Sequence, residues 1–294
     1  MSMSKVRGTS RTQGDSIGPV ARVGPVARVG LGPVLIYAAA ATVASMFLWI
    51  VGDILVHGLG QVNWGFLMNA PMDAGRAGGI GPVLVSTGLV LLVCLGAALP
   101  VAVLCAMFIV HYGGGRLVRA SLDVLAGVPS IVFGLFGAVL FGKILGLGFS
   151  ILCGGLTLAC MVLPLLIRTT EAALSNLPSS YRMGAAALGL GPFAVLFKVL
   201  LPPALPGITV GLVLGIGRAL AETAALIFTA GYVDRMPGSL FDSGRVLSIH
   251  IYDLSMNVPG GDANAYGSAA VLLALLLIIN AAAAWMTRRW HVTL

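Results

Sequence analysis

Two charged side chains interrupt an otherwise apolar stretch at residues 207–230. Arg218 and Glu222 lie four residues apart within it. A charge inside a membrane costs at least about 2.5 kcal/mol on insertion scales and usually marks a pathway for a polar solute. Arginine presents a fork of donors that suits an oxyanion. We therefore expect Arg218 to attract an oxyanion, and Glu222 to orient Arg218 and prevent overly tight binding. The alternative is a structural ion pair that fixes the helix register, which the i, i+4 spacing allows.

Three glycines precede these charges in the same stretch. Gly207, Gly211 and Gly215 are spaced four apart, a small-xxx-small series that lets two helices approach closely. Arg218 and Glu222 continue the spacing by three and four, so we expect all five residues on one helix face. Such a face packs against another helix and does not face lipid.

A further cation, Arg168, lies at the inner end of another apolar stretch. It is a candidate second cationic step on the exit side of the pathway. The alternative is a residue whose charged end snorkels to the membrane interface.

The elements that must position these residues are transmembrane helices. Only 9% of the 294 residues are charged, against about 25% in soluble domains, and the mean hydropathy is +1.01. A helix needs about 20 apolar residues to cross a bilayer. Besides residues 207–230, five charge-free stretches approach or exceed that length: 31–52, 80–109, 124–142, 144–167 and 263–287. We therefore expect an all-α polytopic membrane protein with six transmembrane helices.

The distribution of the basic residues predicts the orientation. With the N-terminus in the cytoplasm, the outside receives Arg76, Lys143, Arg235 and Arg245. The cytoplasmic side receives Lys5, Arg7, Arg11, Arg22, Arg28, Arg116, Arg119, Arg168, Arg182, Lys198, Arg288 and Arg289. This bias places both termini in the cytoplasm. The net charge of +7 therefore reports topology, and we expect no nucleic-acid partner.

Some features exclude other kinds of site. The cysteines Cys94, Cys105, Cys153 and Cys160 lie in apolar stretches without CxxC spacing, so we expect neither a metal site nor a disulfide framework. A GxxxxGK match ending at Lys143 is followed by Ile144, where a phosphate-binding loop needs Ser or Thr. We therefore expect no catalytic residues, no cofactor and no nucleotide site in this chain.

The predicted domain organisation is simple. Residues 1–32 are basic and Gly-Pro-rich, with a tandem repeat at 18–30, and are expected to form a mobile cytoplasmic tail. Residues 33–290 are expected to form one transmembrane domain. Its longest cytoplasmic loop is predicted at 169–205.

That loop carries features of a docking element. We expect a short helix at 181–188, a break at Gly189, and a second short helix at 193–201 that ends at Pro202-Pro203. Small side chains in the first helix would let it seat deeply in a partner's groove. The alternative is an interfacial loop on the lipid surface, because the second helix is rich in apolar residues.

The same loop resembles the coupling loop of ABC importer permeases. The family pattern is Glu-Ala-Ala, three residues, Gly, nine residues, then Ile-x-Leu-Pro. Here Met183-Gly184-Ala185 is followed by Gly189 and by Val199-Leu200-Leu201-Pro202 in the same register, with Met183 in place of the Glu and Gly184 in place of the first Ala. The resemblance implies that residues 181–202 insert into a groove of the ATP-binding subunit. The implied coupling residues are Met183, Gly184, Ala185, Gly189, Leu201 and Pro202.

Further strings resemble the A-type (PstA-like) permease subunits of phosphate-specific ABC importers. They are Gly-Gly-Ile at 78–80, Leu-Ala-Gly-Val-Pro-Ser-Ile-Val-Phe-Gly at 125–134, Glu-Ala-Ala-Leu at 171–174 and Arg-Ala-Leu-Ala-Glu-Thr-Ala at 218–224. The last string continues as Ala-Leu-Ile-Phe-Thr-Ala, which resembles the A-type subunit more than its C-type sibling. The resemblance covers roughly residues 33–290.

The resemblance implies a type I ABC importer permease fold and a set of partners in the bacterial cytoplasmic membrane. These are a homologous C-type permease, a dimer of ATP-binding subunits that holds ATP-Mg, an extracytoplasmic phosphate-binding protein, and membrane lipid. The chain would supply half of an alternating-access pathway without being an enzyme. The alternatives are a permease for sulfate or molybdate, a secondary transporter or channel acting alone, and a structural or signalling membrane protein.

Overall fold

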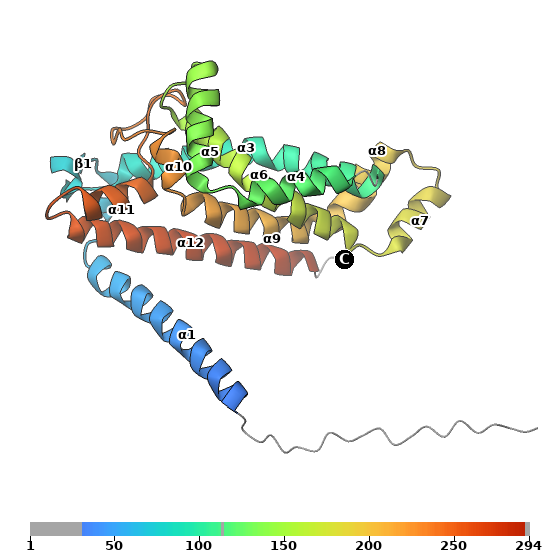
Figure 1. The fold of residues 1–294 in the computed structure, drawn as a ribbon, viewed down its shortest axis with the longest axis horizontal. Helices are drawn as coiled ribbons and strands as arrows, with labels where there is room; N and C mark the ends of the chain where they lie inside the picture. Colours follow the sequence, from blue (N-terminus) through green and yellow to red (C-terminus); the bar gives the residue numbers. More distant parts are fainter. Residues whose placement is uncertain (1–30, 113–114, 292–294) are drawn as a thin grey trace, which may run out of the picture. The chain divides into compact units, whose positions relative to one another are not determined.

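The computed structural model describes residues 31–112 and 115–291 (Figure 1). The chain divides into two compact units, residues 1–49 and 50–294, and each is described by itself. Helix α1 (Leu31–Gly58) begins in the first unit. Its side chains from residue 32 to 49 are all exposed. The tail predicted at 1–32 lies outside the described residues, except for its last two positions.

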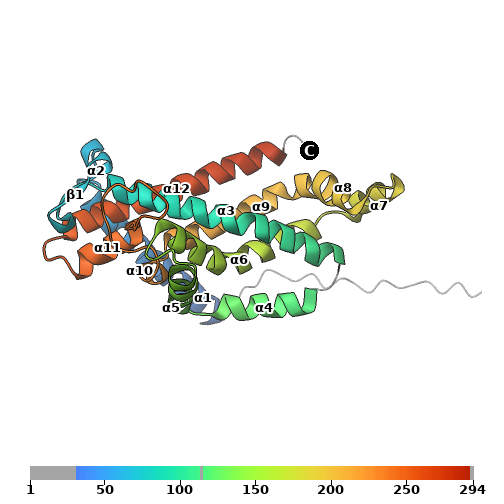
Figure 2. The same ribbon diagram turned by 90° about the horizontal axis from the view of Figure 1, so that it is seen from above.

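The second unit is built on four long helices that run along one direction (Figure 2). They are α3 (Gly81–Tyr112), α6 (Ile151–Ser175), α9 (Leu201–Leu220) and α12 (Asp262–His291). Helix α6 packs against both α3 and α9, and α12 packs against α9. A line of fully buried small residues at four-residue spacing, Cys94, Ala98, Ala102 and Ala106, runs along α3. Small residues at this spacing allow close helix approach in a membrane, so α3 and α6 form the centre of the unit.

Within the described part of the chain, five helical stretches are long and apolar enough to cross a membrane. They are 32–58, 81–111, 151–175, 192–220 and 262–287. A sixth span exists only if a bent pair of helices is counted as one. The prediction of an all-α, multi-pass membrane protein is therefore confirmed, while three of the six predicted spans need correction.

The predicted third span, 124–142, is broken. Helix α4 (Gly115–Gly127) ends before Pro129, and α5 (Ser130–Gly137) continues into the π-helical segment η2 (Ala138–Ile144) at an angle of 100° to α4. Proline disfavours the helical conformation of the residue before it, which here is Val128. The fifteen residues of α5 and η2 would reach only about 22 Å at 1.5 Å per residue, so they need α4 to cross a bilayer. In Figure 1, α5 stands across the long helices.

The predicted fifth span, 207–230, also differs. Its helix starts earlier, because α8 (Pro192–Ala194), the π-helical segment η3 (Val195–Leu200) and α9 run together without interruption. It also ends earlier, at Leu220, and a separate short helix, α10 (Ala224–Ile227), follows. The second short helix predicted at 193–201 therefore does not end at Pro202-Pro203. The helix instead continues through both prolines, which stand just after the π-helical segment η3.

The fourth span is shifted toward the C-terminus relative to the prediction of 144–167. Gly146 and Gly148 adopt positive φ angles of 71° and 58°, a conformation that glycine adopts at little cost, and they form the turn that precedes α6. Ser150 then caps α6 by accepting a hydrogen bond from the Cys153 N–H at 3.1 Å. Helix α6 continues to Ser175, so the first part of the loop predicted at 169–205 is helical. Thr169 fits this helix because its hydroxyl donates to the Leu165 carbonyl at 3.0 Å.

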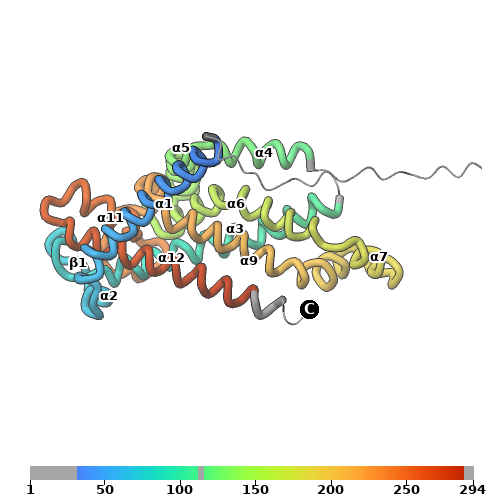
Figure 3. The backbone as a smooth tube through the Cα atoms, turned by 90° about the horizontal axis from the view of Figure 1, so that it is seen from below, coloured from blue at the N-terminus to red at the C-terminus, as the bar shows by residue number. Residues whose placement is uncertain are grey.

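The remaining short elements lie at the two ends of the second unit (Figures 2 and 3). One end carries α7 (Ser179–Ala187) and α8. The other end carries α2 (Trp64–Met68), α10, α11 (Leu247–Met256) and a small antiparallel hairpin. The hairpin consists of β1 (Pro71–Met72), the turn η1 (Asp73–Gly75) and β2 (Ala77–Gly78). We call these two ends the coupling end and the hairpin end.

Candidate functional site

The three glycines of α9 face α6 at short distances. A β-carbon added to Gly207 would lie 2.6 Å from the Ala173 Cβ, and one added to Gly211 would lie 2.7 Å from the Thr169 Cβ. One added to Gly215 would lie 2.9 Å from the Val162 Cγ1. Two of these neighbours are β-carbons, which no rotamer change can move away. The backbone of α9 therefore approaches α6 closely along this line.

We predict that Gly211→Ala destabilises the chain. The added methyl forces α9 away from α6, and overpacking of this kind costs typically about 1–3 kcal/mol. Gly217→Ala is the matched control in the same helix, since the added methyl would meet only the Leu276 Cδ2 at 4.0 Å. Thermal unfolding of the detergent-solubilised chain measures the effect. Equal midpoints for the two variants would contradict the close packing inferred here.

Arg218 lies in the last turn of α9, and its side chain is exposed. It shares the exposure of Val210 and Leu214, which precede it at four-residue spacing and are 54% and 53% exposed. Among the residues that the structure describes, Arg218 has no hydrogen-bond or ion-pair partner. The prediction that Arg218 is packed against another helix is therefore wrong. Its seven-residue separation from Gly211 keeps the two on one side of α9, but the last turn of that side is not covered by α6. The charge points away from the neighbouring helices of its own chain.

Glu222 does not continue α9, so the predicted pair with Arg218 is absent. The helix ends at Leu220, which removes the i, i+4 geometry. The half-buried Glu222 carboxylate instead accepts a hydrogen bond from the Ala225 N–H at 3.2 Å, at the start of α10. Its carbonyl accepts one from the Ser248 hydroxyl at 2.6 Å. Glu222 thus stabilises a break in the fifth span, and interrupted helices of this kind line substrate sites in other membrane transporters.

Arg168 lies on α6, and its charge is partly neutralised within the chain. Its guanidinium pairs with Asp123 of α4. One turn further along, Arg119 of α4 pairs with Glu171 of α6 at 2.6 Å. The two ion pairs run in opposite senses and tie α4 to α6 near the coupling end. Sequence reasoning missed Asp123 and Arg119 as partners because they lie about 50 residues away in the chain.

Helix α7 has two different faces. Met183 is 63% exposed, and a β-carbon at Gly184 would meet no atom within 4 Å. These two residues and Ala187 form an outward face, which we call the coupling face. Ala185 is only 3% exposed and faces inward. Of the predicted coupling residues on α7, Met183 and Gly184 are therefore accessible to a partner, and Ala185 packs against the rest of the chain.

The other predicted coupling residues lie at the boundaries of helices. Gly189 has a φ angle of +63° and follows Leu188, the C-cap of α7, so it serves as the glycine that lets the chain leave the helix. Leu201 and Pro202 are the first residues of α9. Leu201 is partly buried and Pro202 is exposed.

A cluster of charges at the hairpin end was not predicted as a site. Arg245 is 11% exposed, and its Nη1 lies 3.3 Å from the Asp253 carboxylate and 3.9 Å from that of Asp234. Its Nε donates to the Tyr232 carbonyl at 3.0 Å, and its Nη1 lies 3.4 Å from the Nδ1 of His250. This largely buried arginine therefore links α11 to the segment after α10. Sequence reasoning had assigned Arg245 only to the orientation of the chain.

We predict that His250 makes the stability of this end depend on pH. Burial, reinforced by the positive charge of Arg245, lowers the pKa of His250 from 6.5 to about 4, against the opposing influence of Asp234 and Asp253. The unfolded chain therefore takes up a proton below pH 6.5 that the folded chain binds only near pH 4. The contribution of neutral His250 to the free energy of unfolding is fully present above pH 6.5. It falls as the pH is lowered, by about 2 kcal/mol between pH 7 and pH 5.

Unfolding midpoints of the solubilised chain across this pH range test the prediction. His250→Gln should flatten the dependence. His57→Gln, which removes an exposed histidine paired with Asp53, should leave it in place. A pH slope that survives unchanged in His250→Gln would contradict the assignment.

Comparisons with known proteins identify the family. Residues 98–292 match the model of the family described as "Binding-protein-dependent transport system inner membrane component". The chain is 31% identical to the phosphate transport system permease protein PstA 2 of Mycobacterium bovis, over 86% of both chains. It is 29% identical to the probable ABC transporter permease protein YqgI of Bacillus subtilis, over 84% of this chain and 90% of that one.

The fold matches a solved structure of the same kind. Inward-facing MetNI methionine ABC transporter covers 72% of this chain and 94% of the matched chain, with a TM-score of 0.54 and 20% identity. This match confirms the expected type I ABC importer permease fold. The matched family model covers more than half of the chain, and the two named relatives are matched over 90% and 86% of their own lengths. The chain therefore belongs to the family of inner-membrane components of binding-protein-dependent transport systems.

Proposed function

We propose that this chain is the transmembrane permease subunit of an ATP-driven phosphate importer and forms half of its translocation pathway. The observation that carries the proposal is the similarity to a phosphate transport permease over 86% of the chain. The type I importer fold supports the same conclusion. Sulfate and molybdate permeases are the alternatives in the same class.

The position of Arg218 supports a role in the pathway. An exposed and unpaired arginine on an apolar helix would be costly if it faced lipid. The cost is avoided if this face of α9 lines a hydrated pathway against a second permease subunit. There the guanidinium can offer two parallel donors to the oxygens of phosphate.

The other two predicted pathway residues take modified roles in this proposal. Glu222 holds the break that ends α9, and it places a carboxylate near the pathway without pairing to Arg218. Arg168 is a weaker candidate for the exit step, because phosphate would have to compete with Asp123 for its guanidinium.

The proposed partners follow from the family and from the coupling face. They are a homologous C-type permease, a dimer of ATP-binding subunits, and an extracytoplasmic phosphate-binding protein. ATP-Mg would be bound and hydrolysed by the ATP-binding subunits, which would contact Met183 and Gly184 on the coupling face. Closure of the ATPase dimer would then move α7. The movement would pass through η3 to α9, which carries Arg218.

The proposed location is a bacterial cytoplasmic membrane with both termini in the cytoplasm. The excess of Lys and Arg in the predicted cytoplasmic segments supports this orientation. It places the coupling end in the cytoplasm and the hairpin end outside.

Uptake of radiolabelled phosphate in cells that lack this chain tests the proposal. Complementation with the chain should restore phosphate uptake and leave sulfate and molybdate uptake unchanged. It should restore nothing when the ATP-binding partner carries a substitution that abolishes hydrolysis. Restoration of sulfate or molybdate uptake instead would overturn the substrate, and uptake independent of the ATPase would indicate a secondary transporter or channel.

A further inference from the structure

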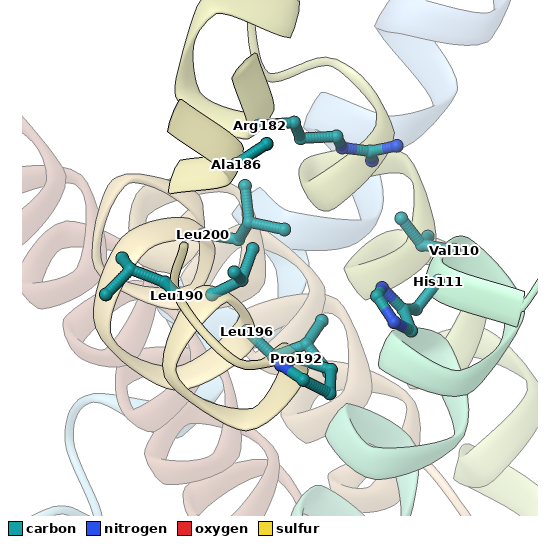
Figure 4. Close-up of a pocket in the computed structure, with 9 residues that line it drawn as sticks. Val110, His111, Arg182, Ala186, Leu190, Pro192, Leu196 and Leu200 are labelled. Atoms are coloured by element: carbon teal, nitrogen blue, oxygen red, sulfur yellow. The ribbon is translucent and has the colours of Figure 1, made fainter. Parts of the chain in front are cut away.

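A cavity of about 410 Å³ lies at the coupling end, between the end of α3, helix α7 and the segment η3. Figure 4 shows Arg182 and Ala186 on α7, and Val110 and His111 at the end of α3, around the same space. Leu190, Leu196 and Leu200 complete much of the wall. The volume falls within the usual range of sites for small molecules, about 300–1,000 Å³.

The cavity combines an apolar wall with a cationic side chain. Leu196 and Leu200 line the cavity and are 9% and 2% exposed. Both belong to the hydrophobic core of the second unit. Arg182 is exposed, and its guanidinium lies at the side of the cavity toward His111 (Figure 4). No Asp or Glu lines the cavity. The electrostatic character is therefore that of a site for an anion attached to an apolar body.

The cavity and the coupling face lie on different sides of α7. Arg182 and Ala186 are separated by four residues and share the side that faces the cavity. Met183, Gly184 and Ala187 lie on the coupling face, and none of them lines the cavity. A ligand in the cavity would therefore contact the back of the helix whose front is open to a partner.

We propose that this cavity binds an anionic phospholipid of the surrounding membrane. The cavity adjoins the last residues of a 31-residue membrane-spanning stretch. At 1.5 Å per residue this stretch is about 46 Å long, close to the roughly 40–45 Å of a bilayer with its headgroups, so its end lies near the lipid phosphates. The Arg182 guanidinium binds the phosphate, and part of an acyl chain lies against Leu190, Leu196 and Leu200. Basic sites beside transmembrane helices on the cytoplasmic side bind anionic headgroups in this way.

A free phosphate ion fits the cavity less well than a lipid does. It would satisfy Arg182 but leave the leucine wall in contact with water, and burial of apolar surface is worth roughly 25 cal/mol per Å². A zwitterionic lipid would bring a second, positive charge close to Arg182. The bound anionic lipid fills the space behind α7 and holds it against α3 and η3. Its binding does not depend on which solute the pathway carries.

Native mass spectrometry of the full chain in detergent tests the proposal. Phosphatidylglycerol and phosphatidylcholine are added separately, and the fraction of chain that retains each lipid is measured. Arg182→Gln removes the cation and Ala186→Phe fills the cavity. Lys198→Gln and Ala187→Phe are the matched controls, because neither residue lines the cavity.

The wild-type chain should retain phosphatidylglycerol at least about fivefold more than phosphatidylcholine. This retention should fall by a similar factor in Arg182→Gln and Ala186→Phe and persist in both controls. Equal retention of the two lipids, or loss in the controls as well, would overturn the proposal. So would displacement of phosphatidylglycerol by millimolar inorganic phosphate, which would show that the cavity takes the free ion.

Discussion

Replacing Arg218 by alanine is expected to abolish phosphate uptake while leaving the folded chain intact. The guanidinium can donate two charge-assisted hydrogen bonds to phosphate, worth about 1.5–3 kcal/mol each. Loss of both lowers uptake by roughly 100-fold or more. Because Arg218 is exposed and has no partner among the described residues, its removal leaves no buried group unsatisfied. The thermal midpoint of the solubilised variant should therefore match that of the wild type.

The design separates charge from geometry. Arg218→Lys keeps the positive charge but loses the planar fork, so it should retain part of the uptake. Arg76→Ala is the matched control, since it removes another exposed arginine, paired with Asp73 at the hairpin end. Uptake is measured with radiolabelled phosphate at equal membrane abundance. Normal uptake by Arg218→Ala would show that this arginine is not part of the pathway.

The sequence predicted the parts of the fold that depend on hydropathy and small-residue spacing. The helical, multi-pass architecture follows from long charge-free stretches, because a helix in lipid must satisfy its backbone internally. The close approach of α9 to another helix follows from the spacing of Gly207, Gly211 and Gly215, although this spacing does not tell that the other helix is α6. These features are local in sequence and do not require knowledge of neighbouring elements.

The breaks in the helices were harder to predict. Pro129 is a visible signal for the bend between α4 and α5, although apolar length alone had merged the two into one span. The end of α9 carries no comparable signal, because Ala221 and Glu222 are good helix formers. Tertiary contacts define that end, above all the hydrogen bond from Ser248 to the Glu222 carbonyl. Ser248 lies 26 residues away, so the pattern around Arg218 could not reveal it.

The ion pairs show the same limit. Arg168 and Glu171 were visible as charges at the end of an apolar stretch, but their partners Asp123 and Arg119 depend on the packing of α4 on α6. In contrast, the glycine after α7 was predicted in register from a motif. The residues of that motif lie within a short stretch of the chain, whereas the two residues of each ion pair are 45 and 52 residues apart.

Replacing Gly184 by tryptophan is expected to uncouple the chain from its ATPase without unfolding it. A β-carbon at this position meets no atom of its own chain within 4 Å, so the added ring protrudes from the coupling face. In a groove that fits small side chains, overpacking costs about 1–3 kcal/mol and lowers affinity by roughly 10- to 100-fold. Phosphate uptake and co-purification of the ATP-binding subunits should fall together, with the unfolding midpoint unchanged.

The matched control is Gly60→Trp, at the hairpin end, where an added β-carbon also meets no atom within 4 Å. It adds the same ring to an equally open position far from the coupling face, so co-purification of the ATPase should be retained. If Gly184→Trp and Gly60→Trp both retain the ATPase, α7 does not seat in a partner's groove by this face. If both lose it, the tryptophan acts through general destabilisation, which the unfolding midpoints would reveal. Loss in Gly184→Trp alone assigns the contact to the coupling face, because the two variants differ only in which end carries the ring.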